Sequence, residues 1–413
     1  MHTLIRPFRA LRPVPERAAA VAAPPYDVLN TEEARQRANG RPASFLHISR
    51  PEIDLPAGTD PYSPAVYARG AENLRRLIDE GTLVRDEKPH YYIYQLRMGE
   101  QVQTGVACVA SVAEYDRNRI RKHEFTRPDK EDDRVRQITA LNAQTGPVLL
   151  AYRNNVELHE IIKDNSKGFP ACEVTADDGV VHTIWVLNDR AQISAVTRIV
   201  DAMDSLYIAD GHHRAASASR VAAARNAGNP HHSGDLDYNY FLCVAFPHNE
   251  LRIFDYNRVV QDLNGLSPAE LLLRIGQLFA VTQVGEPARP RRTGQFGMYL
   301  DGNWYQLDLR PGLTPTDPVA SLDVSLLQDH LLAPVLGVGD PRRDRRIDFV
   351  GGIRGLGELE RRVDSGEMAV AFTLFPTRLE ALMAVADANL VMPPKSTWFE
   401  PKLADGLLSH VLD

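Results

Sequence analysis

Apolar residues follow two patterns along this chain: short continuous runs, and positions that recur every three or four residues. The run at Ser44–Ser49 predicts a strand, and the runs at Tyr91–Arg97 and Gln103–Ala113, separated by a short glycine-containing turn, predict a hairpin. The spacing over Val66–Glu80 and Arg190–Met203 predicts helices. This alternation of strands and helices predicts a mixed α/β (α+β) protein.

The most informative stretch joins an apolar run, Leu206–Ala209, to an alanine-rich segment, Ala215–Asn226, through Asp210 and Gly211. It predicts a strand, a tight turn and a helix. The first turn of a helix has free N–H groups and attracts anions, whereas a cation such as Arg214 is unfavourable there. A bound phosphate would explain why a cation, Arg214, stands in this first turn. The alternative is that Asp210 caps the helix, Gly211 is the turn residue, and Arg214 pairs with Asp210 or another surface acid.

A second polar stretch, which contains His123 and Glu124, precedes a helix that Pro128 is expected to open. Thr126 and Asp129 resemble a capping box for this helix. His123 and Glu124 lie on the approaching loop, where catalytic groups are common. The alternative is that these charges belong to a solvated surface.

Near the C-terminus, Val391–Lys402 contains three prolines, which exclude a helix and stiffen the backbone. Lys395, Ser396 and Thr397 lie in this segment and could bind an anion. The alternative is a surface tail packed on its own aromatic residues.

Composition adds limits rather than a function. The 413 residues suggest two or three domains, and the net charge of −7 gives no reason to expect nucleic acid or anionic membrane as a partner. No apolar run approaches the ~20 residues that span a bilayer, and the N-terminus lacks the apolar core of a secretory signal. Cys108, Cys172 and Cys243 have no metal-type spacing and are expected to be reduced. We therefore expect a cytoplasmic protein, and the sequence leaves a homo-oligomer open.

Three blocks now stand in one order: His123-Glu124, Asp210-Gly211-His212-His213-Arg214, and Pro394-Lys395-Ser396-Thr397. This order resembles the free-serine kinases of the ParB/sulfiredoxin-like superfamily. Over its full length the chain resembles the DUF1015 family, through Pro24–Val28, Lys122–Glu124 and the Met392–Lys402 tail among other features.

The resemblance implies a nucleotide-binding core at residues 116–250, preceded by a mixed α/β segment at 1–115. It also implies a C-terminal α+β domain at 251–413, whose tail returns to the active site. The implied activity is Mg²⁺-dependent transfer of a phosphoryl group from ATP or ADP to the hydroxyl of free serine or a similar hydroxy or amino acid.

The resemblance also implies roles for individual residues. Glu124 would be the general base with His123 beside it, and Asp210 would position the phosphates or a Mg²⁺ ion. Four residues would hold the phosphates, namely Gly211, His212, His213 and Arg214. Lys395, Ser396 and Thr397 would help to hold the acceptor. One departure is Trp398, which stands where those kinases have arginine and leaves the contact to the acceptor carboxylate open.

Two further interpretations remain at this point. The chain could be a non-catalytic, ParB-like nucleotide-binding switch, or a scaffold that has kept the fold without activity. The sequence contains neither a Walker-type phosphate loop nor a Rossmann glycine motif, which excludes a P-loop kinase and argues against a dehydrogenase.

Overall fold

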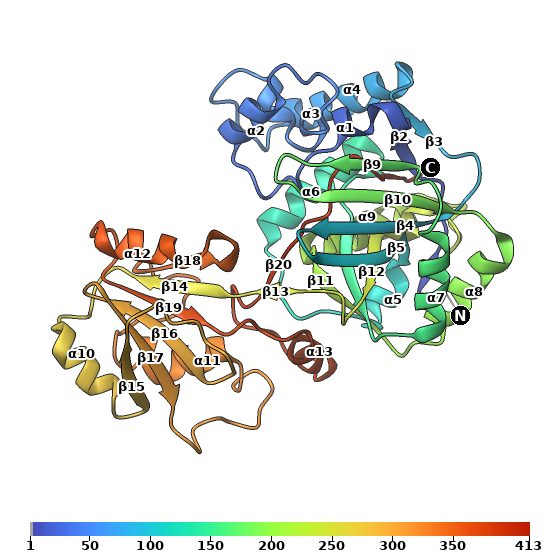
Figure 1. The fold of residues 1–413 in the computed structure, drawn as a ribbon. Helices are drawn as coiled ribbons and strands as arrows, with labels where there is room; N and C mark the ends of the chain where they lie inside the picture. Colours follow the sequence, from blue (N-terminus) through green and yellow to red (C-terminus); the bar gives the residue numbers. More distant parts are fainter. Residues whose placement is uncertain (1–2) are drawn as a thin grey trace. The chain divides into compact units, whose positions relative to one another are not determined.

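The computed structural model describes residues 3–413 and separates the chain into two compact units (Figure 1). The first unit contains the chain up to residue 251 together with the last segment, residues 401–413. The second unit contains residues 252–400. Each unit is described on its own below.

A nine-stranded mixed sheet is the centre of the first unit, with the order β6-β11-β8-β12-β5-β4-β10-β9 and β1 paired to β5. Its strands are β1 (Ile5–Arg6), β4 (Tyr91–Met98), β5 (Gln101–Ser111), β6 (Ile120–Arg121), β8 (Val148–Tyr152), β9 (Cys172–Thr175), β10 (Val181–Leu187), β11 (Leu206–Asp210) and β12 (Tyr240–Pro247). β11 runs parallel to β6, and β12 runs parallel to β8. The predicted hairpin is confirmed, because β4 and β5 pair antiparallel around Gly99, which adopts a positive φ.

Two apolar clusters hold the helices of this unit in place. One joins the sheet to α5, α6, α7, α8 and α9, and the other joins α1–α4 to the end of α6. The helices are α1 (Ala18–Val21), α2 (Thr31–Ala38), α3 (Leu46–Ser49), α4 (Pro64–Asp79), α5 (Val112–Asp116), α6 (Pro128–Leu141), α7 (Val156–Asn165), α8 (Arg190–Asp201) and α9 (His212–Gly228). α9 buries mostly alanine side chains, so its backbone lies close to the elements it packs on.

Short elements tie the end of the chain into the first unit. β21 (His410–Val411) pairs with β7 (Ala143–Gln144), which follows α6. Near the start of the chain, β2 (Leu11–Pro13) pairs with β3 (Leu83–Arg85). Within the tail, the Ala404 N–H donates to the Tyr94 hydroxyl at 3.3 Å. Residues 401–413 are thereby fixed against the large sheet.

The second unit has an antiparallel six-stranded sheet with the order β15-β17-β16-β19-β14-β18. Its elements are β13 (Ile253–Phe254), β14 (Tyr256–Val260), α10 (Pro268–Ile275), β15 (Phe279–Val284), β16 (Gln295–Leu300), β17 (Asn303–Leu309), α11 (Asp323–Leu327), a π-helical turn (Gln328–Leu332), β18 (Ile347–Gly351), α12 (Gly357–Asp364), β19 (Val370–Leu374), α13 (Leu379–Asp387) and β20 (Trp398–Phe399). β13 and β20 pair separately from the large sheet.

The mixed α/β class is confirmed, and three local expectations are corrected. Residues 1–115 and 116–250 are not separate segments, because β4 and β5 share one sheet with β8, β11 and β12. The last 13 residues belong to the first unit rather than to a C-terminal domain. Ser44–Ser49 is not a strand, since α3 begins at Leu46.

None of the helices in residues 3–413 is long and apolar enough to cross a membrane.

Candidate functional site

The turn between β11 and α9 is built around Gly211, which adopts φ +98° and ψ 29° at the N-cap of the helix. A Cβ atom at this position would lie 2.9–3.0 Å from the Arg214 guanidinium, which folds back over the turn. An L side chain is strained in this conformation and would also displace the arginine. Glycine therefore lets the guanidinium lie directly against the start of the 17-residue helix.

Asp210, the last residue of β11, is held between two cations. Its Oδ2 lies 3.4 Å from the guanidinium of Arg214 and 3.4 Å from Nζ of Lys402, which comes from the tail. Burial alone would raise the pKa of Asp210, but the charges of Lys402 and Arg214 outweigh it and hold that pKa well below its usual value. Two cations, Lys402 and Arg214, therefore lie beside the N-terminus of α9 together with the Asp210 carboxylate.

Glu124 lies beside the same helix terminus. Its Oε2 is 3.8 Å from Nδ1 of His212, and its side chain is 56% exposed, whereas His212 is buried. The His212 ring also packs edge-on against His123, with 4.4 Å between ring centroids. The structure thus brings His123 and Glu124 to the start of α9, as the resemblance implied.

The two rings are neutral in this environment. Burial lowers the pKa of His123 to about 4. Burial is also the main reason that the pKa of His212 lies well below its ordinary value, and the nearby His123 ring lowers it further. Neither ring nitrogen of His123 makes a hydrogen bond of good geometry among residues 3–413, although the backbone of Ile208 lies close enough to oppose the fall in the ring's pKa. A buried polar group of this kind is an unusual feature that marks the site.

His123, Glu124 and His212 place one donor atom each within 4.8 Å of one another, as metal ligands do. However, the backbone N–H of His123 donates to Nε2 of His212 at 3.3 Å. The proton of the neutral His212 ring then sits on Nδ1, the nitrogen that faces Glu124. A metal could bind at Nδ1 only if this proton moved to Nε2, which would break the hydrogen bond from the His123 N–H. Mg²⁺ in any case prefers oxygen ligands, such as the carboxylates of Asp210 and Glu124.

Arg214 points into the protein rather than into solvent. Its side chain is 12% exposed and also donates to the carbonyl of Pro147. It lines a cavity of about 30 Å³ together with Arg134, Tyr26 and Asp405. Burial raises the pKa of Asp405 to about 7, although the nearby Arg214 opposes this shift. One Asp405 carboxylate oxygen, Oδ1, has no hydrogen-bond partner among the described residues.

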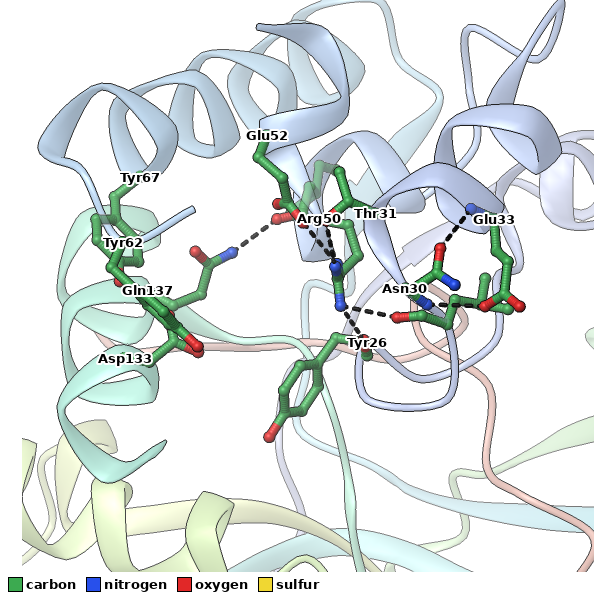
Figure 2. Close-up of polar contacts among 12 residues, drawn as sticks. Tyr26, Asn30, Thr31, Glu33, Arg50, Glu52, Tyr62, Tyr67, Asp133 and Gln137 are labelled. Carbon is green, nitrogen blue, oxygen red and sulfur yellow. Dashed lines mark hydrogen bonds and ion pairs between the residues drawn. The ribbon is translucent and has the colours of Figure 1, made fainter. Parts of the chain in front are cut away.

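The proline-rich segment at residues 24–28 is braced by Arg50, as Figure 2 shows. Arg50 Nη1 donates to the carbonyl of Tyr26 at 3.0 Å and to that of Leu29 at 2.9 Å, and Nε pairs with Glu52 at 2.7 Å. The Arg134 guanidinium lies over the Tyr26 ring, with 3.9 Å between Cζ of Arg134 and the centroid of the ring. The segment therefore forms one wall of the cavity behind Arg214.

Four of these residues were not expected at the site from the sequence: Tyr26, Arg134, Lys402 and Asp405. Each is brought in by long-range packing, and only the proline-rich segment that carries Tyr26 gave a signal in the sequence. The expected capping box is also absent, since Arg127 is the N-cap of α6 and no side chain caps it. Thr126 instead bonds to Glu131, because Arg127 rather than Thr126 precedes the first helical residue. Lys395, Ser396 and Thr397 lie in the second unit, and their role in this site stays a prediction.

Comparisons with solved structures give only distant likenesses. A conserved hypothetical protein from Pyrococcus furiosus is 12% identical, with 73% of this chain and 94% of that chain covered and a TM-score of 0.34. A free serine kinase in complex with AMP is 14% identical, with 73% and 92% covered and a TM-score of 0.35. A C-terminally truncated SbnI from Staphylococcus aureus is 10% identical, with 72% and 85% covered and a TM-score of 0.38. TM-scores this low assign neither fold nor function.

Comparison with protein families is more informative. No curated protein matches this chain. The family model described as a protein of unknown function, DUF1015, matches residues 5–325, which is well over half of the sequence. The chain therefore belongs to the DUF1015 family.

Proposed function

We propose that this protein is a nucleotide-dependent phosphotransferase whose acceptor is a hydroxyl group of a small amino or hydroxy acid. One observation carries the proposal: an exposed carboxylate, Glu124, lies beside a helix N-terminus where Asp210 is paired with both Lys402 and Arg214. This combines a candidate base with a positively charged cradle, which are the two parts that phosphoryl transfer requires of a protein.

The N-terminus of α9 is the proposed phosphate site. Its first-turn N–H groups and the helix dipole favour an anion, and Gly211 lets the Arg214 guanidinium lie against this turn. Lys402 and Arg214 are the cationic side chains of this region, and Lys402 is the more exposed of the two. The order of sequence motifs shared with free-serine kinases supports ATP or ADP as the donor.

Glu124 is the proposed general base. It would accept the proton of the acceptor hydroxyl while that oxygen bonds to the terminal phosphorus. The bond from this phosphorus to the bridging oxygen breaks, and its electron pair stays on the departing nucleotide. A positioned base of this kind contributes about 10²–10⁴-fold to the rate.

The residues present are compatible with Mg²⁺ entering as the nucleotide complex. Asp210 and Glu124 offer carboxylate oxygens, and a bound Mg²⁺ ion would neutralise phosphate charge. Lys395, Ser396 and Thr397 remain the proposed contacts to the acceptor, on the strength of the motif order in the sequence.

A transfer screen tests this function. The full chain is incubated with Mg²⁺ and either ATP or ADP labelled in the terminal phosphate, over a panel of amino and hydroxy acids. We expect label to appear in a phosphoester of at least one hydroxylated acid, and none in alanine or propionate, which lack the hydroxyl. Nucleotide binding without transfer to any acceptor would instead favour the ParB-like switch.

A further inference from the structure

We propose that His212 and His213 are positioning residues that pin the loop His123–Arg127 to the start of α9. That this pinning places Glu124 for catalysis rests on the proposed function, whereas the pinning itself does not. The resemblance implied that both histidines hold phosphates, and the geometry points to a different use of their rings.

Two backbone hydrogen bonds carry the inference. The N–H of His123 donates to Nε2 of His212 at 3.3 Å, and the N–H of Arg127 donates to Nε2 of His213 at 3.1 Å. Two neighbouring side chains in the first turn of α9 thus hold two amides that lie four residues apart. Glu124 lies between these two anchors, so its backbone cannot move away from the helix without breaking one of them.

The anchors matter because the loop between them is exposed. Phe125 is 69% exposed and the Glu124 side chain 56% exposed, so apolar burial contributes little to holding this segment. The flanking elements are fixed independently. β6 pairs with β11 on one side, and on the other side Arg220 of α9 forms ion pairs with Glu131 and Asp132 of α6.

His212 has a second contact in the same direction. Because its Nε2 accepts a backbone N–H, its Nδ1 carries the ring proton and faces Glu124 Oε2 at 3.8 Å. One buried ring therefore holds the backbone before Glu124 and turns its N–H toward the carboxylate. Nε2 of His212 is engaged within the protein, and the first-turn backbone N–H groups of α9 remain as phosphate donors.

His213 allows a clean test because it is only partly buried. In His213→Gln the amide oxygen reaches about as far as Nε2 and can still accept from Arg127, whereas His213→Ala removes the acceptor. Hydrogen–deuterium exchange of the peptide that covers residues 122–128 is measured in the full chain. The control is His231→Ala, at an exposed histidine in the loop after α9.

We expect His213→Ala to speed exchange of this peptide about two- to tenfold, the effect of losing one hydrogen bond, and His213→Gln to restore at least half of the protection. His231→Ala should leave it unchanged. In a transfer assay, His213→Ala should lower kcat while the Kd of the nucleotide changes less than about twofold.

The outcomes separate this inference from the proposed function. Unchanged exchange in His213→Ala, or equal loss in the Ala and Gln variants, overturns the pinning even if the wild type transfers phosphate. Faster exchange only in His213→Ala supports the pinning even if the wild type transfers none. A large rise in nucleotide Kd with unchanged exchange would return His213 to the role of a phosphate ligand.

Discussion

Replacing Glu124 with glutamine is expected to lower the rate of phosphoryl transfer by about 10²–10⁴-fold, which is the usual contribution of a positioned general base. Glutamine keeps the size and the polarity of the side chain but cannot accept the hydroxyl proton. Nucleotide affinity should stay within about threefold of the wild type, since Glu124 lies beside the positive cradle and is not one of its cations. The rate is measured with the acceptor found in the transfer screen, and the affinity by calorimetry.

The matched control for this variant is Glu157→Gln, an exposed glutamate on α7 in the same unit. It should transfer at the wild-type rate. If Glu124→Gln keeps more than about a tenth of the wild-type rate, Glu124 is not the base and the chemistry assigned to this loop is wrong.

Replacing Asp405 with asparagine is expected to change how stability depends on pH. The pKa of Asp405 is about 7 in the folded protein against an ordinary value of 3.8, so its neutral form favours folding. This contribution is fully present below about pH 4 and is lost as the pH rises through 7. A gap of about three pKa units corresponds to about 4 kcal/mol, so we expect the stability of Asp405→Asn relative to wild type to rise by a few kcal/mol between pH 4 and pH 8.

Urea denaturation at a series of pH values measures this difference, in which the titrations common to both proteins cancel. Asp177→Asn, at a half-exposed position in the same unit, is the control and should show no comparable slope. A free-energy difference between Asp405→Asn and wild type that is flat from pH 4 to pH 8 would show that Asp405 is charged throughout this range. The cavity behind Arg214 would then hold a full buried negative charge.

Local sequence patterns predicted the elements that carry the site. The apolar run and alanine-rich segment around Gly211 became β11 and α9, and Pro128 opens α6 as expected. These elements follow from periodicity and from residues with fixed backbone preferences, which act over short distances. The run at Ser44–Ser49 failed because a short apolar stretch fits a buried helical turn as well as a strand.

The wider site could not be predicted in this way. Lys402 is 192 residues from Asp210 in sequence, and the pairing of β21 with β7 helps to place its segment. Arg134 lies in the charged first half of α6, yet its side chain is only 13% exposed and packs on Tyr26. The ring nitrogens of His212 and His213 also meet backbone amides, which no sequence motif encodes. Long-range pairing therefore decides which charges surround the start of α9.

The most direct measurement is a calorimetric titration of the full chain with ADP and with ATP in the presence of Mg²⁺. We compare wild type with Arg214→Ala, Lys402→Ala and the control Arg220→Ala, which removes an exposed arginine from the same helix. We predict one saturable site, whose affinity falls about 10–100-fold on loss of either site cation and changes less than about twofold in the control. If neither nucleotide binds, or if folded Arg214→Ala and Lys402→Ala bind as tightly as wild type, the start of α9 is not a nucleotide site.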